Sequence, residues 1–410
     1  MPFLPYRTVR NKTNPKENGA IRPLPFTALP PRNRIVPTAP GLPEYYDVGQ
    51  TQWTGSWSPY LDSVVSGAGG VAVTADRSAM GADLTGTDKW FGGVLAPNGK
   101  IYCAPNTAPD ILIIDTVTGT ATRSAMGANL SGPGGKWYGG VLAPNGKIYC
   151  VPYNAPDILI IDPVAGTATR SAMGASLSDG FKWIGGVLAP NGKIYCVPGN
   201  AANILIIDPV AGTATRSAMG ASLGDGDKWY GGVLAPNGRI YCVPYNSTDI
   251  LIINPVTGTA TRSPMGASLI GGNKWIGGVL APNGKIYCVP YFATDILIID
   301  PVTGFATRSA MGASLSGSAK WMGGALLPNG RIYCVPYNST DILIINPVAG
   351  TATRSALGAS LSGSSKWIGG VLAPNGTIYT APFNATDILR ITTGASINIK
   401  LALTPYFNKF

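Results

Sequence analysis

The chain has 410 residues, of which only 12% are charged, about half the ~25% of ordinary globular proteins. Its formal net charge is +10, it contains no histidine, and its two glutamates are Glu17 and Glu44. General acid–base chemistry in the remainder would have to use Asp, Lys or Tyr. No apolar run approaches the ~18 residues of a membrane span. We therefore predict a protein that is not an enzyme and has no membrane span.

Residues 1–48 have the composition of an extended arm. They hold ten prolines, seven Lys or Arg and three acidic residues. Proline favours extended backbone, and a segment of this kind cannot bury a core by itself. We predict a basic arm over 1–48 and a linker over 49–70. No apolar core of a signal peptide occurs in the first 39 residues. The candidate docking residues of the arm are Arg7, Arg10, Arg22, Arg32 and Arg34.

From about residue 71 the chain repeats itself. A tryptophan in the string Lys-Trp-x-Gly-Gly recurs after 47 residues and then five times after 46; these tryptophans are Trp90, Trp137, Trp183, Trp229, Trp275, Trp321 and Trp367. Pro-Asn-Gly, Ile-Tyr, an Ile-Leu-rich run and a threonine-rich run ending in Arg-Ser follow in nearly every unit. A period of 40 to 50 residues is typical of propeller blades.

Each unit predicts four short antiparallel strands. Gly-Gly-Val-Leu-Ala is the first, and Asn-Gly predicts a tight hairpin with positive φ at both residues. Lys-Ile-Tyr-Cys-Val is the second strand, and the apolar Ile-Leu-Ile-Ile run is the third. Asp-Pro-Val-Thr-Gly turns the chain into a Thr-Ala-Thr-Arg-Ser strand. Four antiparallel strands at this period make one blade of a β-propeller.

The ends of the repeat region predict a closed ring. The fourth-strand pattern first occurs at 71–80, before the first tryptophan, so that strand has no blade of its own. We predict an all-β, seven-bladed propeller over 71–392, in which strand 71–80 completes the last blade and leaves no exposed edge. An alternative for that strand is 395–403. Residues 393–410 form a C-terminal tail.

The Gly-Gly-Val-Leu-Ala-Pro-Asn-Gly-Lys-Ile-Tyr string, with its following Ile-Leu-Ile-Ile-Asp-Pro, resembles NHL-type and related propeller repeats over about 320 of the 410 residues. The resemblance implies the fold. It does not imply a function, because such propellers include enzymes, scaffolds and lectins.

Most chemically interesting residues recur in every blade and are interpreted as structural. Cysteine occupies one second-strand position in six blades, at Cys103, Cys150, Cys196, Cys242, Cys288 and Cys334. Equivalent positions in neighbouring blades are too far apart for disulfides, so we expect buried free thiols. The tryptophans are interpreted as core wedges. Asp225 and Asp227 are too few ligands for calcium, and neither metal nor cofactor is predicted.

Two faces carry candidate binding residues. One presents a basic collar of Lys100, Lys147, Lys193, Arg239, Lys285 and Arg331, which suits an acidic partner or is simply solvated. Nucleic acid is not expected, because the collar lacks interleaved aromatics. The other face carries loop residues that suit a sugar or protein partner, unless the aromatics pack between blades: Tyr153, Asn154, Tyr245, Asn246, Tyr291, Phe292, Tyr337, Asn338, Phe383 and Asn384.

A compact ring with extended arms resembles the plan of a virion subunit. We therefore expect a non-enzymatic structural protein of a bacteriophage particle, in the tail, baseplate or capsid decoration. It would be made in the host cytoplasm and docked through the arm to other structural proteins of the same assembly. The alternative is a stand-alone multivalent lectin for cell-surface glycans, with repeat length and regularity similar to those of tachylectin-like propellers. An intracellular scaffold for peptides is a third hypothesis.

Overall fold

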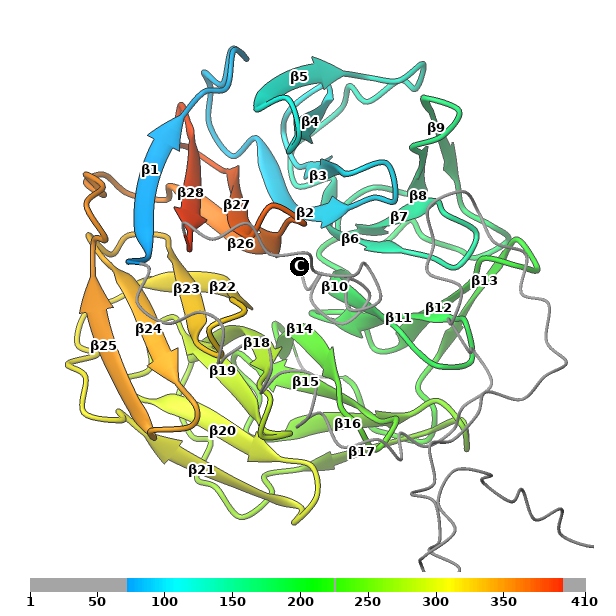
Figure 1. Ribbon diagram of the computed structural model, residues 1–410. Coiled ribbons are helices and arrows are strands. Elements are labelled where there is room, and N and C mark those ends of the chain that lie inside the picture. Colours follow the sequence, from blue (N-terminus) through cyan, green and yellow to red (C-terminus); the bar gives the residue numbers. More distant parts are fainter. Residues whose placement is uncertain (1–71, 225, 394–410) are drawn as a thin grey trace, which may run out of the picture. The chain divides into compact units, whose positions relative to one another are not determined.

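A computed structural model of the protein describes residues 72–224 and 226–393. The predicted arm (1–48), the linker (49–70), the alternative strand 395–403 and almost all of the tail lie outside the described residues. The described residues form strands and turns without a helix, and accordingly no helix there is long and apolar enough to cross a membrane. Figure 1 shows seven sheets arranged in a ring, which confirms the predicted all-β, seven-bladed propeller.

Each blade is a four-stranded antiparallel sheet whose first strand lies innermost, against the first strands of its neighbours. The strands, blade by blade, are β2 (Trp90–Leu95), β3 (Lys100–Pro105), β4 (Ile111–Asp115) and β5 (Thr120–Ser124); β6 (Trp137–Leu142), β7 (Ile148–Pro152), β8 (Ile158–Asp162) and β9 (Thr167–Ser171); β10 (Trp183–Leu188), β11 (Ile194–Pro198), β12 (Ile204–Asp208) and β13 (Thr213–Ser217); β14 (Trp229–Leu234), β15 (Ile240–Pro244), β16 (Ile250–Asn254) and β17 (Thr259–Ser263); β18 (Trp275–Leu280), β19 (Ile286–Pro290), β20 (Ile296–Asp300) and β21 (Phe305–Ser309); β22 (Trp321–Leu326), β23 (Ile332–Pro336), β24 (Ile342–Asn346) and β25 (Thr351–Ser355); and β26 (Trp367–Leu372), β27 (Thr377–Pro382), β28 (Ile388–Thr392) and β1 (Thr74–Ser78).

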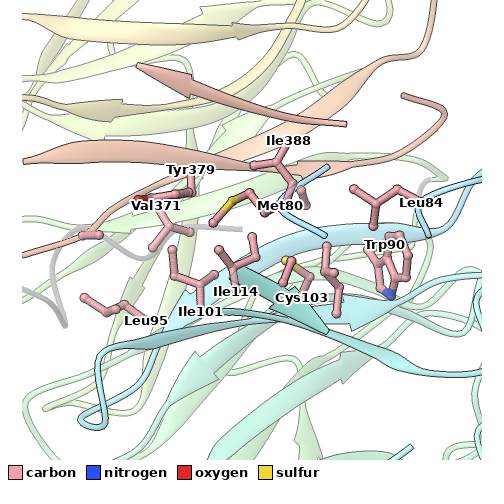
Figure 2. Close-up of a cluster of buried hydrophobic side chains, with 14 of the residues drawn as sticks. Met80, Leu84, Trp90, Leu95, Ile101, Cys103, Ile114, Val371, Tyr379 and Ile388 are labelled. Carbon is pink, nitrogen blue, oxygen red and sulfur yellow. The ribbon is translucent and has the colours of Figure 1, made fainter. Parts of the chain in front are cut away.

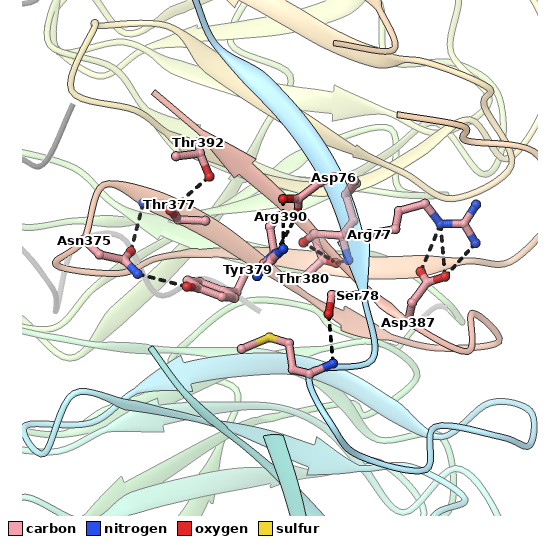
Figure 3. Close-up of polar contacts among 12 residues, drawn as sticks. Asp76, Arg77, Ser78, Asn375, Thr377, Tyr379, Thr380, Asp387, Arg390 and Thr392 are labelled. Atoms are coloured by element: carbon pink, nitrogen blue, oxygen red, sulfur yellow. Dashed lines mark hydrogen bonds and ion pairs between the residues drawn. The ribbon is translucent and has the colours of Figure 1, made fainter. Parts of the chain in front are cut away.

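The seventh blade joins the two ends of the described chain. β1 is the outer strand of this blade and pairs antiparallel with β28, with Asp76 opposite Arg390. In Figure 3 these two side chains face each other, and they form hydrogen bonds of 2.6 and 2.8 Å. Arg77 forms a second ion pair, 2.7 Å, with Asp387. The six other third strands have isoleucine where β28 has Arg390, so the first pair is specific to the closing blade.

Reversing the charge of Asp76 is expected to weaken ring closure. Asp76→Arg places two arginines opposite each other across β1 and β28, which costs about 1 kcal/mol in the free energy of unfolding. The double variant Asp76→Arg/Arg390→Asp restores opposite charges and should recover most of that loss in urea titrations. A double variant no more stable than the single one would contradict this account of the closing contact.

Adjacent blades are sealed by equivalent apolar clusters. Figure 2 shows the cluster between the seventh and first blades, where Trp90, Met80 and Cys103 pack with Val371 and Tyr379. Every tryptophan that opens a blade is 0% exposed, and the six cysteines are buried and free. The blade-to-blade surfaces therefore form the core of the ring, and the cysteines act there as small apolar residues.

The Gly-Gly pair after each tryptophan has a geometric role. The register of β2 against β3 shifts between Trp90 and Gly93, which marks a β-bulge, and Gly92 has a φ of 72°. A Cβ on Gly93 would lie 2.9 Å from the Ile101 side chain, so a larger residue does not fit there. The same register shift after the first residue or two occurs in all seven first strands. Such bulges change where the neighbouring side chain points.

The Asn-Gly hairpin differs from its prediction. Gly99 has a φ of 77°, but Asn98 is not among the residues with positive φ. The amide of Gly99 donates to the carbonyl of Ala96 at 3.0 Å. Pro97 fixes the second residue of this turn at negative φ, which favours a type I turn followed by a left-handed glycine. The prediction of two positive φ angles neglected this proline.

Candidate functional site

The innermost strands bring one variable residue per blade together. This residue follows the tryptophan in Lys-Trp-x-Gly-Gly, beside the bulge. In the blades in chain order it is Phe91, Tyr138, Ile184, Tyr230, Ile276, Met322 and Ile368. Six of these seven belong to one cluster that spans the ring, together with residues from the loops after the second strands. Residues from so many blades can meet only where the innermost strands converge, so this cluster lies near the propeller axis.

Eight aromatic side chains in this region form a series of ring contacts that is open only at the third blade, here named the axial aromatic cluster. Phe91, Tyr138 and Tyr153 stack in one column with centroid distances of 4.0 and 3.8 Å. Tyr230 stacks on Tyr245 at 3.9 Å. The series then continues from Tyr245 through Tyr291, Tyr337 and Phe383 back to Phe91, at 5.9 to 6.3 Å.

Across the third blade the series has no ring contact among the described residues, and Tyr153 and Tyr230 lie on the two sides of this gap. That blade contributes only Ile184 and Gly199 at the two equivalent positions. The hydroxyl of Tyr230 donates to Asp227 Oδ1 at 3.2 Å. The phenol of Tyr230 and the carboxylate of Asp227 therefore lie on the side of the cluster that lacks a third-blade aromatic.

The tyrosines of this cluster remain protonated over the physiological pH range. Burial raises the pKa of Tyr153 and of Tyr245 to about 12, and it raises the pKa of Tyr138, Tyr230 and Tyr291 further. The negative charge of Asp227 adds to the rise for Tyr153, Tyr230 and Tyr245. The site therefore offers neutral phenol groups, which donate and accept hydrogen bonds, beside carboxylates that accept them.

The six predicted loop aromatics all belong to this region. Tyr153, Tyr245, Tyr291, Tyr337 and Phe383 are members of the cluster itself. Phe292 is 41% exposed and lies beside Tyr291, with the ring centroids 5.0 Å apart. These aromatic residues therefore pack against one another between blades and also line the candidate site.

The four predicted asparagines have a visible structural role. The Oδ1 atoms of Asn154, Asn246, Asn338 and Asn384 accept backbone N–H groups of the next blade at 2.6 to 2.7 Å. The donors are Phe181, Asn273, Ser365 and Asp88, whose φ angles lie between 50° and 54°. These amide oxygens hold left-handed turns in place, and the NH₂ group of Asn154 also donates to the carbonyl of Gly134 at 3.3 Å.

Sequence reasoning missed Phe91, Tyr138, Tyr230 and Asp227 as members of the site. It treated the ring as almost perfectly symmetric, whereas the residue after each tryptophan varies from blade to blade. Asp227 was considered only for calcium with Asp225, which is not described. Within 72–224 and 226–393, no three Cys, Asp or Glu side chains are grouped so as to hold a metal ion.

A buried lysine precedes each tryptophan on the same face. The Nζ of Lys89 donates to the carbonyls of Gly86, Phe383 and Ala385 at 2.8 to 3.1 Å, which ties the first blade to the seventh. Its Nζ also lies 5.8 Å from the centroid of the Trp90 ring. Burial lowers the pKa to about 8 for six of these lysines: Lys89, Lys136, Lys182, Lys274, Lys320 and Lys366.

These lysines and the buried thiols predict a stability maximum near pH 9. Between pH 8 and 10.5 the unfolded chain keeps lysine protons that the folded chain has lost, so stability rises with pH. Burial raises the pKa of Cys103 from 9.0 to about 12 and that of the other five thiols further. Above pH 9 thiols and then tyrosines ionise in the unfolded chain but not in the folded chain, and this loss of stability outweighs the remaining gain from the lysines. We expect Tm, measured by calorimetry, to rise from about pH 7.5 to about 9 and then fall; a steady fall would contradict this.

Comparison with known proteins identifies the fold and no family. No family model matches the chain, and no curated protein matches it. Among solved structures, a streptogramin B lyase matches with a TM-score of 0.61 and 15% identity, over 78% of this chain and 98% of that one. A virginiamycin B lyase from Staphylococcus aureus with quinupristin gives 0.61 and 15%, over 78% and 99%. The hydrazine synthase of Kuenenia stuttgartiensis gives 0.56 and 14%, over 77% and 98%.

These likenesses correct one prediction. The chain was expected not to be an enzyme, and this is contradicted by the enzymes, lyases among them, that share its fold. The argument from missing histidine and glutamate was too strong, because Asp, Lys and Tyr remain available for proton transfer. At 15% identity the likeness shows the fold and assigns no activity. The similarity to NHL-type repeats likewise remains a resemblance between repeats.

Proposed function

We propose that the propeller binds a carbohydrate at the axial aromatic cluster. The proposal rests on one observation: the repeats are nearly identical in sequence, but they differ at the positions whose side chains meet near the propeller axis. Each repeat keeps its Trp, Gly-Gly and Pro-Asn-Gly, yet the residue after the tryptophan and the residue after the second strand change between blades. Packing alone would accept one residue at all seven positions, so the divergence favours a ligand without sevenfold symmetry.

The chemistry of the cluster suits a sugar. Aromatic rings bind the apolar C–H faces of sugars, and phenol and carboxylate oxygens bind their hydroxyls. Tyr138 is stacked on both faces, by Phe91 and by Tyr153, so it offers a ligand only its edge and hydroxyl. Tyr291 and Tyr337 make only tilted contacts and are half-buried, which makes them the better stacking platforms.

This proposal differs from a multivalent lectin in the number of sites. A multivalent lectin with one site on each of seven blades would have similar binding residues at the same position of every repeat. The axial aromatic cluster is instead a single site whose residues differ from blade to blade. A glycan array probed with the purified protein tests the proposal. We expect a narrow set of hits, each weakened by Tyr291→Ala. Silence across the array would contradict carbohydrate binding.

The same glycans should be examined for turnover. Enzymes share this fold, and Asp227 lies beside a phenol within the cluster. Mass spectrometry of each bound glycan after incubation distinguishes binding from cleavage. Unchanged mass identifies a binding protein, whereas a shortened or unsaturated product identifies an enzyme acting at this site.

A second proposal concerns the arm. Ten prolines and seven basic residues in 1–48 support a role as an assembly subunit, such as a phage tail, baseplate or capsid decoration protein, that docks through this segment. Limited trypsin digestion of the isolated protein tests it. Rapid cleavage between Arg7 and Arg34, leaving a resistant core, is expected if the arm needs a partner. Protection of these sites in the isolated protein would contradict docking of the arm on a neighbour.

A further inference from the structure

The basic collar on the face opposite the axial aromatic cluster is largely neutralised. Four of its lysines each form an ion pair with an aspartate at the end of the third strand of the same blade. The pairs are Lys100–Asp115, Lys147–Asp162 and Lys193–Asp208 at 3.2 Å, and Lys285–Asp300 at 3.4 Å. A partner would therefore meet a much weaker positive charge on this face than the six basic residues of the predicted collar indicate.

Two blades depart from this pairing in the same way. The fourth and sixth blades have arginine in place of lysine and asparagine in place of aspartate: Arg239 with Asn254, and Arg331 with Asn346. Asn254 Oδ1 still accepts the amide of Val256 at 3.0 Å, as Asp300 accepts that of Val302. Asparagine thus keeps the turn-capping bond of aspartate and loses its charge, so the exposed guanidinium on each blade has no carboxylate partner among the described residues.

One of these arginines follows a turn that is hydrogen-bonded to a neighbouring blade, and that blade has an exposed aromatic ring. In the fifth blade, Val302 of the β20–β21 turn is 86% exposed, and Phe305, the first residue of β21, is 65% exposed. The exposed valine recurs in five other blades, whereas the exposed phenylalanine does not. The six other fourth strands have threonine in place of Phe305. The turn that precedes Arg239 is bound to this blade, because Asn237 Nδ2 donates to the carbonyl of Pro301 at 3.1 Å. Arg239, Val302 and Phe305 are here named the Arg239 patch.

We propose that the Arg239 patch docks an acidic segment of a partner protein that carries an aromatic or aliphatic anchor. The uncompensated guanidinium fits a carboxylate in bidentate geometry. Phe305 and Val302 supply apolar area that a partner would remove from water. Arginine and exposed aromatic residues are the types that dominate the energy of protein interfaces. The Arg239 and Asn254 pair lacks the ion pair of four other blades, and Phe305 exposes an aromatic ring to water. Neither feature helps the fold, but a free guanidinium and an exposed ring are both groups that a partner can bind.

A random copolymer of glutamate and tyrosine is a suitable probe, with polyglutamate of equal length as the probe without apolar anchors. We expect the labelled copolymer to bind the full chain in fluorescence anisotropy at about 0.15 M salt, and about fivefold tighter than polyglutamate. The variant Arg239→Lys/Asn254→Asp/Phe305→Thr restores the common repeat residues, so it should fold as the other blades do. It is expected to weaken copolymer binding about tenfold.

The matched control is Arg331→Lys/Asn346→Asp, which makes the same charge change in the sixth blade, next to a blade that has no counterpart of Phe305. It should change the Kd less than about twofold. Three results would overturn the proposal: no binding by the unaltered chain, equal loss in the control, or an unchanged Kd in the triple variant. Duplex DNA bound as tightly as the copolymer, and lost equally in the triple variant, would show a polyanion site instead of an acidic protein site.

Discussion

Replacing Trp275 by alanine is expected to lower the free energy of unfolding by about 3 to 5 kcal/mol. The ring is 0% exposed, and its Nε1 donates to the carbonyl of Asp295 at 2.8 Å. The guanidinium of Arg308 lies 5.3 Å from the ring centroid, and Lys274 Nζ lies 5.9 Å from it. The substitution therefore removes a large apolar contact, a hydrogen bond and two cation–π contacts at one blade interface.

Trp275→Phe separates these contributions. It keeps most of the apolar volume and the cation–π face but leaves the carbonyl of Asp295 without its donor. The expected loss is about 1 kcal/mol, because the carbonyl of Asp295 is only partly buried and loses one hydrogen bond. Urea unfolding followed by circular dichroism measures both variants. A loss below about 1 kcal/mol for the alanine variant would show that the wedge is not essential to the blade interface.

Removing an axial tyrosine is expected to abolish most ligand binding while leaving the fold intact. Tyr245→Ala deletes a half-buried ring that stacks on Tyr230 at 3.9 Å, and so disrupts two neighbouring members of the cluster. We expect the Kd for a glycan identified on the array to rise at least about tenfold, as at the centre of an interface. Tyr245→Phe removes only the hydroxyl and should raise the Kd less.

Tyr241 provides the control from the same blade. Its hydroxyl accepts a hydrogen bond from Asn237 Nδ2 at 3.0 Å, in the turn on the opposite face. Tyr241→Phe removes a phenol hydroxyl of the same kind, at the cost of one hydrogen bond, and should leave the Kd unchanged. If Tyr241→Phe and Tyr245→Phe weakened binding equally, the effect would come from general loosening of the blade. The assignment of the site to the axial aromatic cluster would then be wrong.

The fold was predictable because every level of the sequence agrees. The repeat length gives the blade, the Ile-Leu-Ile-Ile run gives its buried third strand, and the unpaired pattern at 71–80 places one strand ahead of the first blade. Where the prediction failed, a neighbouring residue that the prediction had not considered changed the local geometry or charge. Pro97 changed the turn type, and Asp115 with its equivalents cancelled most of the basic collar.

The site was only partly predictable, for two physical reasons. Loop aromatics such as Tyr245 are visible in the sequence because they follow the second strand and begin a polar loop. Tyr230 is not, because it lies in a strand between a tryptophan and two glycines, and only the three-dimensional bulge at that position brings it to the cluster. Aligning the seven repeats and asking where they differ would have identified Phe91, Tyr138 and Tyr230 without a structure.

The stoichiometry of glycan binding tests the central claim most directly. Isothermal titration of the strongest array hit into the full chain should give one ligand per chain, with no measurable heat for Tyr245→Ala. This result follows from a single asymmetric site built by several blades together. A stoichiometry near seven, with Tyr245→Ala removing only one site of the set, would contradict the axial site and place binding on the individual blades.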